Sequence, residues 1–203
     1  AALYPEYTVE VHDDAQCLEF LNTLGTEYVD FFKQCKHGPI KADFWRACML
    51  RERGGVYSDI DNTPVEPLRT FLKPKYTFVT AGFIGSMWLL PSLPIVNPMF
   101  IACTPHNPIM VESVNLFFKI RDKPYTYGRY SIMANLGHIL QNYMDTRNNA
   151  KEVYTNGQCI LMLQETLVEP LKGMYGVAYM APGKKLVLRN KDKSYDNKTA
   201  KRV

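Results

Sequence analysis

The chain has 203 residues, which is enough for one substantial hydrophobic core and too few for two ordinary domains. Its composition, 46% hydrophobic and 22% charged residues, is that of a globular protein, and no apolar run reaches the roughly 20 residues that a membrane span requires. The net charge of +4 is concentrated in residues 184–203, where eight basic and two acidic residues give +6 and leave the rest of the chain slightly acidic.

Apolar spacing predicts the secondary structure of the first quarter of the chain. Residues 8–11 alternate in polarity and include β-branched side chains, which is typical of a strand. Asp13 or Asp14 can cap a following helix, and Gly54 and Gly55 can end a later one, because glycine readily adopts the left-handed conformation of a helix C-cap. The first of these helices carries Cys17, Leu18, Leu21 and Leu24 on one stripe, and two more are expected over residues 27–35 and 39–53.

Strand and helix patterns alternate through the remainder. Residues 56–60 predict a short strand that leads into a polar turn at residues 61–64. Helices are expected over residues 108–120 and 131–143, and strands over residues 76–81, 99–103, 159–163, 176–180 and 186–188. The alternation predicts a single α/β domain over residues 1–203, with a mostly parallel or mixed sheet flanked by helices.

The five cysteines are scattered and form no C-x-x-C pair, which argues against both a zinc site and a disulfide framework. The N-terminus also lacks the basic and apolar regions of a signal peptide. These features predict a cytoplasmic protein with reduced thiols, and the Golgi lumen is the alternative if a targeting segment has been removed.

Asp59 and Asp61 lie two residues apart at the end of the strand expected over residues 56–60. Side chains at this spacing share a face of a strand, and the turn that follows lets the two carboxylates converge. Such a pair suits a hard divalent cation, which often bridges protein oxygens to substrate phosphates. A pair of solvated turn carboxylates is the alternative, and the D-x-D pattern alone does not decide between them.

The helix before this strand adds a second pair. Asp43 and Arg46 are three residues apart and therefore lie on one helical face. The helix ends at Gly54 and Gly55, directly before the D-x-D strand, so both pairs are expected to meet at one crevice. An ordinary intrahelical ion pair is the structural alternative.

Taken together, the run from Lys41 to Asp43 with Arg46, and the run from Gly54 to Asp61, resemble the D-x-D sugar-transferase family. This family contains initiating α-1,6-mannosyltransferases, α-1,4-galactosyltransferases and capsule glycosyltransferases, and the clostridial glucosylating toxins are more distantly similar. The resemblance is strongest over residues 4–72. It implies a GT-A type fold with a Rossmann-like nucleotide-binding sheet. The donor-binding half would cover about residues 1–105, and the acceptor-side half with the basic tail would cover about residues 106–203.

The resemblance also implies residue roles. Asp61 would coordinate Mn²⁺ (or Mg²⁺) directly, and Asp59 would contact the ribose, the donor sugar or a metal-bound water. Asp43 and Arg46 would hold the donor-sugar hydroxyls and the diphosphate, and Tyr57 would lie beside the nucleotide. Asp59, Asp61 and Arg46 are the expected catalytic residues, because the metal and the arginine would neutralise charge on the departing nucleoside diphosphate.

The sequence departs from the family pattern in two places. The first strand of the family, which helps to seat the base, would lie ahead of Tyr4. Many members also place a late histidine near the metal, whereas no histidine follows His138 here. Asn190, Asp192 or Ser194 in the basic tail could substitute for it.

The expected activity is transfer of a hexose from a nucleoside diphosphate sugar to a glycan, glycoprotein or other hydroxyl acceptor, with retention of anomeric configuration. A UDP-sugar such as UDP-glucose or UDP-galactose is the first expectation for the donor, and GDP-mannose is the second. Neither a nucleic-acid partner nor a membrane span in this chain is expected.

Two other functional classes fit parts of the sequence. The run from Asp59 to Thr63 fits the D-x-D-x-T motif of haloacid-dehalogenase-type phosphatases, in which Asp59 would be the nucleophile and Asp61 the general acid/base. That class also requires a downstream pair of acids, which the sequence lacks. A nucleic-acid-binding module could instead use the basic tail, but Tyr195 is its one aromatic residue, so stacking on bases has little support.

Overall fold

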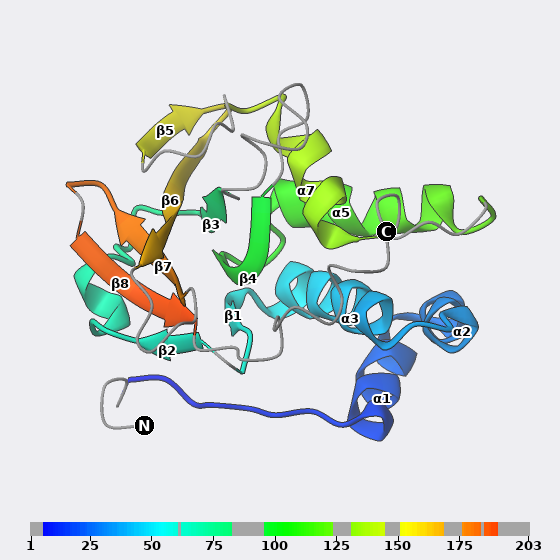
Figure 1. Ribbon diagram of the computed structural model, residues 1–203. Helices are drawn as coiled ribbons and strands as arrows, with labels where there is room; N and C mark the ends of the chain where they lie inside the picture. The colour runs from blue at the N-terminus through cyan, green and yellow to red at the C-terminus, as the bar shows by residue number, and fades with distance from the viewer. Residues whose placement is uncertain are drawn as a thin grey trace, which may run out of the picture.

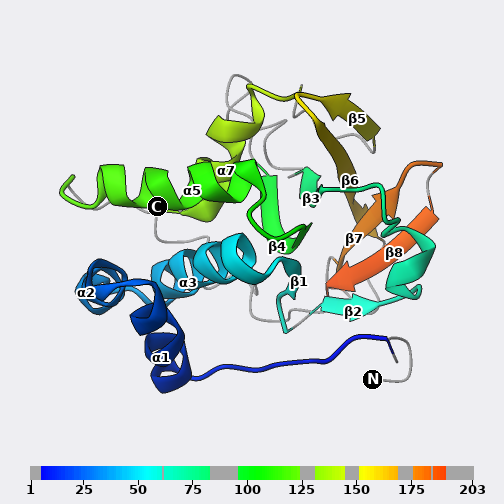
Figure 2. The same ribbon diagram turned by 180° about the vertical axis from the view of Figure 1, so that it is seen from behind.

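A mixed β-sheet and a group of helices form two layers in the computed structural model (Figures 1 and 2). The residues that the structure describes are 6–60, 62–82, 96–123, 131–144, 151–168, 176–183 and 185–190. The helices are α1 (Asp14–Leu24), α2 (Thr26–Gln34), α3 (Gly38–Arg53), α5 (Pro108–Ile120) and α7 (Ile132–Leu140), with a short 3₁₀ helix η1 (Leu68–Thr70). The strands are β1 (Gly55–Ser58), β2 (Asn62–Pro64), β3 (Phe78–Gly82), β4 (Val96–Cys103), β5 (Lys151–Thr155), β6 (Gln158–Val168), β7 (Gly176–Ala181) and β8 (Lys185–Asn190).

The strands pair in the order β1-β4-β3-β6-β7-β8-β2, and β5 pairs with β6 off this path. Among the described strands, β3 and β6 run parallel and every other pair runs antiparallel. The predicted α/β class with a mixed sheet flanked by helices is therefore confirmed, in its mixed rather than its mostly parallel form. The D-x-D segment follows β1, which lies at one end of this order.

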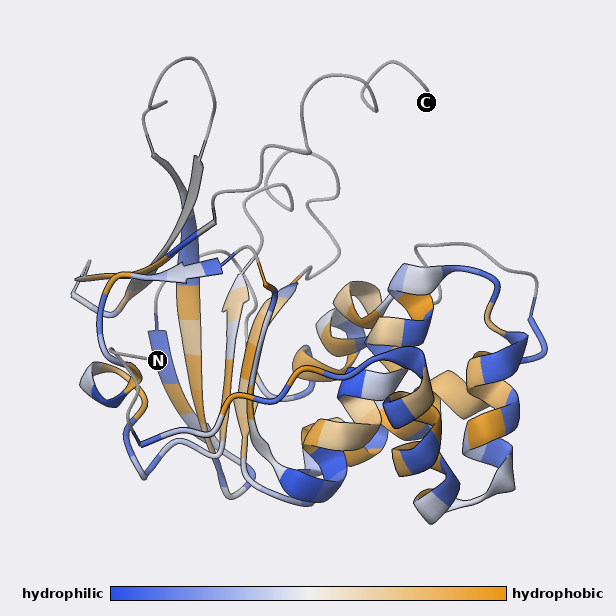
Figure 3. Cartoon of the chain, turned by 90° about the horizontal axis from the view of Figure 1, so that it is seen from below, coloured by the Kyte–Doolittle hydropathy of each residue, from blue (hydrophilic) through white to orange (hydrophobic). Residues whose placement is uncertain are grey.

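The central strands bury side chains on both faces of the sheet. Phe78, Ile160 and Met162 belong to the larger core, which includes the buried faces of the helices. Val79 and Leu161 alternate with them and belong to a second core on the opposite face. Figure 3 shows hydrophobic residues along the central strands and on the helices that pack beside them. Because the central strands are covered on both faces, they give α3 and β1 a rigid support.

Most of the predicted helices are confirmed within one or two residues at each end, and the helix caps follow the expected chemistry. The Asp13 carboxylate accepts a hydrogen bond from the Gln16 amide at 2.9 Å and caps α1. The strand predicted over residues 8–11 is wrong, because this segment is extended but joins no ladder among the described strands, and Val9 and Val11 are exposed. It is the dark blue segment that leads to α1 in Figure 1.

Gly54 ends α3 as predicted, with a φ of 62° and an amide that donates to the Leu50 carbonyl at 2.9 Å. A β-carbon at Gly54 would lie 2.6 Å from the backbone nitrogen of Pro105 and 2.7 Å from the carbonyl oxygen of Cys103. No other residue type therefore fits this position without moving the backbone.

We expect Gly54→Ala to lower the free energy of unfolding by about 2–3 kcal/mol, because it adds backbone strain and a steric overlap. Gly157→Ala is the matched control, since Gly157 has a φ of 73° but a β-carbon there would meet no heavy atom within 4 Å. Urea unfolding of both variants measures the difference. Equal losses would contradict the proposed close approach at residue 54.

The described helices include none that is both long and apolar enough to cross a membrane. All five cysteines are free.

Candidate functional site

Arg46 is the centre of a buried charged cluster where α3 meets β1, β4 and α7. Its Nη2 lies 2.8 Å from Oδ1 of Asp43, one helical turn earlier on α3. The two side chains are only 8% and 6% exposed, so water screens their interaction very little. A buried pair of this kind requires close geometry and further hydrogen bonds to offset its desolvation.

The other side of the Arg46 guanidinium faces the D-x-D strand. Its Nη1 donates to the Pro98 carbonyl at 3.0 Å and lies 3.5 Å from Oδ1 of Asp59. The guanidinium carbon also lies 4.2 Å from the centre of the Tyr57 ring, and the Tyr57 hydroxyl donates to Oδ1 of Asp59 at 2.7 Å. Arg46 therefore lies between two carboxylates, one buried and one partly exposed.

Asp43 also connects this cluster to the beginning of α7. Its Oδ2 accepts a hydrogen bond from the Ile132 amide at 3.0 Å, at the helix end where a negative charge is favourable. Burial raises the pKa of Asp43, whereas the Arg46 charge and the Ile132 hydrogen bond oppose the rise. Both carboxylate oxygens are thus engaged, and the position of Arg46 depends on Asp43.

Tyr57 is held as a neutral hydrogen-bond donor. Burial raises the pKa of its hydroxyl, and the carboxylate of Asp59 adds to the rise while Arg46 opposes it. The hydroxyl therefore remains protonated at physiological pH and orients one oxygen of Asp59.

The main chain on either side of residues 60 and 61 is fixed to β4. The Asp59 amide donates to the Met99 carbonyl at 2.9 Å, and the Asn62 amide donates to the Asp59 carbonyl at 3.1 Å. The Asn62 side chain donates to the same Met99 carbonyl at 2.8 Å and to the Ser58 hydroxyl at 3.1 Å. Asp59 is therefore held at a defined place beside Arg46.

The donor chemistry of the described cluster fits a hard divalent cation. The Asp59 side chain is 32% exposed, so part of it is accessible to solvent, and carboxylates are preferred ligands of Mn²⁺ and Mg²⁺. Across the described ranges, no group of three or more His, Cys, Asp or Glu side chains could hold a metal ion. Asp61 lies outside the described residues, so only Asp59 of the two predicted metal ligands is described.

The predicted residues Asp43, Arg46, Tyr57 and Asp59 thus come together in one cluster. Asp192 and Ser194 lie outside the described residues, and only the backbone of Asn190 is described, opposite Asn62 in the β2–β8 pair. The sequence patterns missed the main-chain partners at Pro98, Met99 and Ile132. Every residue type carries a main-chain carbonyl, and all but proline carry a main-chain amide. The sequence therefore does not indicate which of these groups contact the cluster, and only the tertiary structure reveals them.

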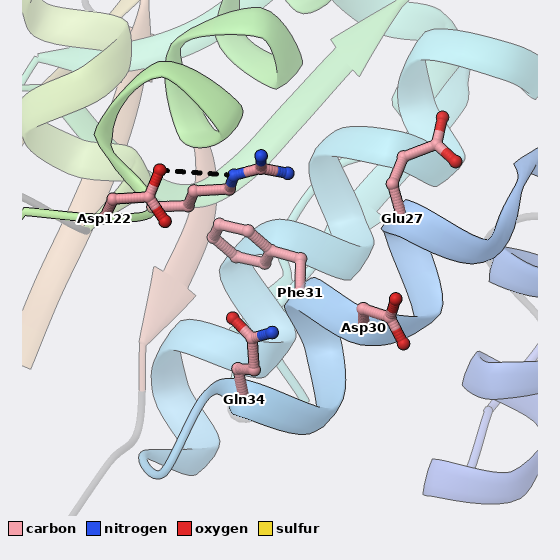
Figure 4. Close-up of a pocket in the computed structure, with 6 residues that line it drawn as sticks. Glu27, Asp30, Phe31, Gln34 and Asp122 are labelled. Carbon is pink, nitrogen blue, oxygen red and sulfur yellow. Dashed lines mark ion pairs between the residues drawn. The ribbon is translucent and has the colours of Figure 1, made fainter.

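A separate surface pocket of about 250 Å³ lies between α2 and the end of α5 (Figure 4). Its lining is Glu27, Asp30, Phe31, Gln34, Arg121 and Asp122. None of the cluster residues lines it, and Asp122 is paired with Arg121 at 3.5 Å. We assign it no role in the chemistry of the cluster.

The segment that carries the cluster matches a known family. Residues 1–79 match the family described as "Glycosyltransferase sugar-binding region containing DXD motif". The predicted resemblance to the D-x-D sugar-transferase family is confirmed. Asp43, Arg46, Tyr57, Asp59 and Asp61 all lie within the matched residues.

Two curated relatives are named "Initiation-specific alpha-1,6-mannosyltransferase". The protein from Schizosaccharomyces pombe is 28% identical over 126 residues, which is 55% of this chain and 32% of the relative. The protein from Candida albicans is 37% identical over 67 residues, which is 32% of this chain and 17% of the relative. The chain therefore spans about a third or less of the length of the curated relatives it matches.

Among solved structures, the chain is similar to a "PaToxG Glycosyltransferase". The TM-score is 0.41 at 17% identity, over 62% of this chain and 40% of the other.

Proposed function

We propose that this chain is a metal-dependent glycosyltransferase that takes a nucleoside diphosphate sugar as donor and a hydroxyl group of a glycan or glycoprotein as acceptor. The observation that supports this most strongly is the Arg46 guanidinium, buried between Asp43 and Asp59 within the segment that matches the D-x-D family. Arg46 contacts Asp59 of the D-x-D segment as well as Asp43, so the two residues of α3 form more than an intrahelical ion pair.

The reaction breaks the bond between the sugar and the diphosphate, so negative charge develops on the departing nucleoside diphosphate. Arg46 would offset that charge as a fixed cation whose position is set by Asp43 and by the Pro98 carbonyl. Asp59 and Asp61 would hold Mn²⁺ or Mg²⁺, which when bound supplies a second positive charge at the diphosphate. Tyr57 would orient Asp59 toward the ribose, the donor sugar or a metal-bound water.

We infer a mannosyl donor before a glucosyl or galactosyl donor. From the sequence alone, a UDP-sugar is the first expectation and GDP-mannose the second, but both curated relatives are named mannosyltransferases. GDP-mannose is therefore the donor to test first, with UDP-glucose and UDP-galactose next. Retention of configuration stays a prediction of the family resemblance, and the cytoplasmic compartment stays a prediction from the scattered cysteines and the N-terminal sequence.

The phosphatase interpretation of residues 59–63 has less support. It gives no role to Asp43 and Arg46, whereas Arg46 lies between Asp43 and Asp59 in the structure, in the segment matched by a sugar-transferase family. The nucleic-acid interpretation depends on the basic tail, which lies mostly outside the described residues.

A panel of ligands tests the proposed function. We expect GDP or UDP to raise the melting temperature only when Mn²⁺ or Mg²⁺ is present, because Asp59 and Asp61 would hold the metal and its positive charge would attract the diphosphate. A ligand at a hundred times its dissociation constant stabilises the native state by about 2.7 kcal/mol. Calorimetry easily resolves the rise in melting temperature that results. CMP and a generic phosphomonoester serve as controls. Release of phosphate from the phosphomonoester, without any response to nucleoside diphosphates, would favour the phosphatase instead.

A further inference from the structure

Glu165 on β6 is a buried carboxylate that has no part in the site described above. It is 2% exposed, and its Oε1 accepts a hydrogen bond at 2.7 Å from Nδ2 of Asn97, which is 3% exposed. A carboxyl group in such surroundings is costly to bury unless its oxygens are hydrogen-bonded. The pair therefore needs an explanation beyond packing.

Asn97 stands at the beginning of an irregular stretch of β4. Val79 and Ala81 of β3 are two residues apart, but their partners on β4, Ala102 and Asn97, are five residues apart. Three extra residues of β4 therefore leave the regular ladder between these pairs, as in an extended β-bulge. Bulges of this kind re-aim the main chain, and this one contains Pro98 and Met99.

The main-chain carbonyl groups of Pro98 and Met99 accept hydrogen bonds from residues of the candidate site. The Pro98 carbonyl accepts from Arg46 at 3.0 Å, and the Met99 carbonyl accepts from the Asp59 amide at 2.9 Å and from the Asn62 side chain at 2.8 Å. The direction of the bulge thus sets the positions of both Arg46 and the D-x-D segment.

The Asn97 side chain fixes the bulge from within. Its Oδ1 accepts from the Met99 amide at 3.1 Å, while its Nδ2 donates to Glu165. The Met99 amide can only donate, so it faces Oδ1 of Asn97, and Nδ2 is left to donate to the carboxyl group of Glu165. Glu165 therefore stabilises the orientation in which Oδ1 faces the Met99 amide.

We propose that Asn97 and Glu165 are positioning residues for the donor site, acting through the bulge at Pro98 and Met99. This inference rests on the proposed function for its consequence in catalysis, but the structural link can be measured without it. Substitution of the pair should loosen the D-x-D segment and weaken diphosphate binding.

Three variants test the proposal. Asn97→Asp sets two buried carboxyl groups against each other, and Glu165→Gln replaces the carboxyl group with an amide that can both donate and accept, so that the Asn97 amide can turn over. The double variant Asn97→Asp with Glu165→Gln restores one amide and one carboxylate with both hydrogen bonds in place. Glu152→Gln is the matched control, since this exposed carboxylate on β5 bonds to Lys75 and Tyr76, which take no part in the candidate site.

Two measurements, both made well below the melting temperature, are needed. The first is hydrogen exchange at the Asp59 amide, and the second is the affinity for whichever of GDP or UDP the wild-type protein binds with Mn²⁺. We expect each single variant to speed exchange at Asp59 and to weaken binding about tenfold, as for one lost hydrogen bond. The double variant should return to within about twofold of wild type, and Glu152→Gln should change neither quantity.

The outcomes separate the two proposals. Single variants that melt earlier but keep wild-type exchange at Asp59 and wild-type affinity would overturn the positioning role and leave a purely structural one. If the wild-type protein binds neither nucleoside diphosphate, the proposed function fails, and the exchange data alone decide whether the bulge positions Asp59. If Asn97→Asp does not fold, Glu165→Gln supplies the same two readouts.

Discussion

Replacing Arg46 with alanine is expected to abolish donor binding and to lower the free energy of unfolding by about 3–5 kcal/mol, the usual cost of leaving one partner of a buried ion pair alone. Asp43 is as buried as Arg46, and the Tyr57 ring packs against the guanidinium. The variant would leave the Asp43 carboxylate without its cation and without access to solvent. Chemical unfolding and calorimetric titration of a nucleoside diphosphate with Mn²⁺ measure the two losses.

The pH dependence of this variant identifies the cause of its instability. Burial already raises the pKa of Asp43, and Arg46 opposes that rise, so removal of Arg46 should raise the pKa further. A raised native pKa means that the native state binds the proton more tightly than the unfolded state. The deficit relative to wild type should therefore shrink as the pH falls through the raised pKa toward the ordinary value of an aspartate.

Arg51→Ala is the matched control, because Arg51 lies on the same helix and pairs with Glu52 and Tyr28 away from the site. It should lower stability while leaving diphosphate affinity unchanged. If the two arginine variants lose affinity equally, Arg46 has no special role in donor binding.

The second large effect is expected at the D-x-D pair. Under the proposed function, Asp61→Ala and Asp59→Ala should each reduce kcat/KM by at least about 100-fold, since each would remove a ligand or an orienting group from the metal proposed to stabilise the leaving diphosphate. The Asp59 side chain is 32% exposed, so its loss should change stability by only about 1 kcal/mol. Large losses of activity with small losses of stability are the signature of a functional carboxylate.

Asp30→Ala controls for the removal of an exposed carboxylate elsewhere, in the pocket beside α2. It should leave activity and the metal-dependent shift in melting temperature unchanged. Retention of that shift in Asp61→Ala would contradict the assignment of Asp61 to the metal.

The parts of this structure that follow local rules could be predicted from sequence. The Asp13 cap, the glycine that ends α3 and the apolar stripes of α3 and α5 each depend on residues close in the chain. Asp43, Arg46 and Asp59 could also be placed together, because a helix that ends directly before a strand brings its last turns near that strand. The family resemblance then added the metal and the donor, which spacing alone does not show.

The parts that depend on distant segments could not be predicted. Residues 8–11 have the pattern of a strand, but no neighbouring strand among those described is available to pair with them. Residues 62–64 were expected only as a turn, and they form β2 because β8 returns beside them from more than 100 residues later. No pattern in the sequence indicates the bulge at Pro98 and Met99 or the role of the buried Glu165. Both depend on contacts between segments that are distant in the chain.

The central claim is that Asp43, Arg46 and Asp59, with Asp61, form the donor site. It is tested most directly by diffraction from crystals soaked with Mn²⁺ and the nucleoside diphosphate that binds best. We predict an anomalous manganese peak at the Asp59 and Asp61 carboxylates, with the diphosphate within reach of Arg46. A manganese peak and a diphosphate bound elsewhere, with Arg46 still held only by Asp43, Asp59 and Pro98, would contradict it.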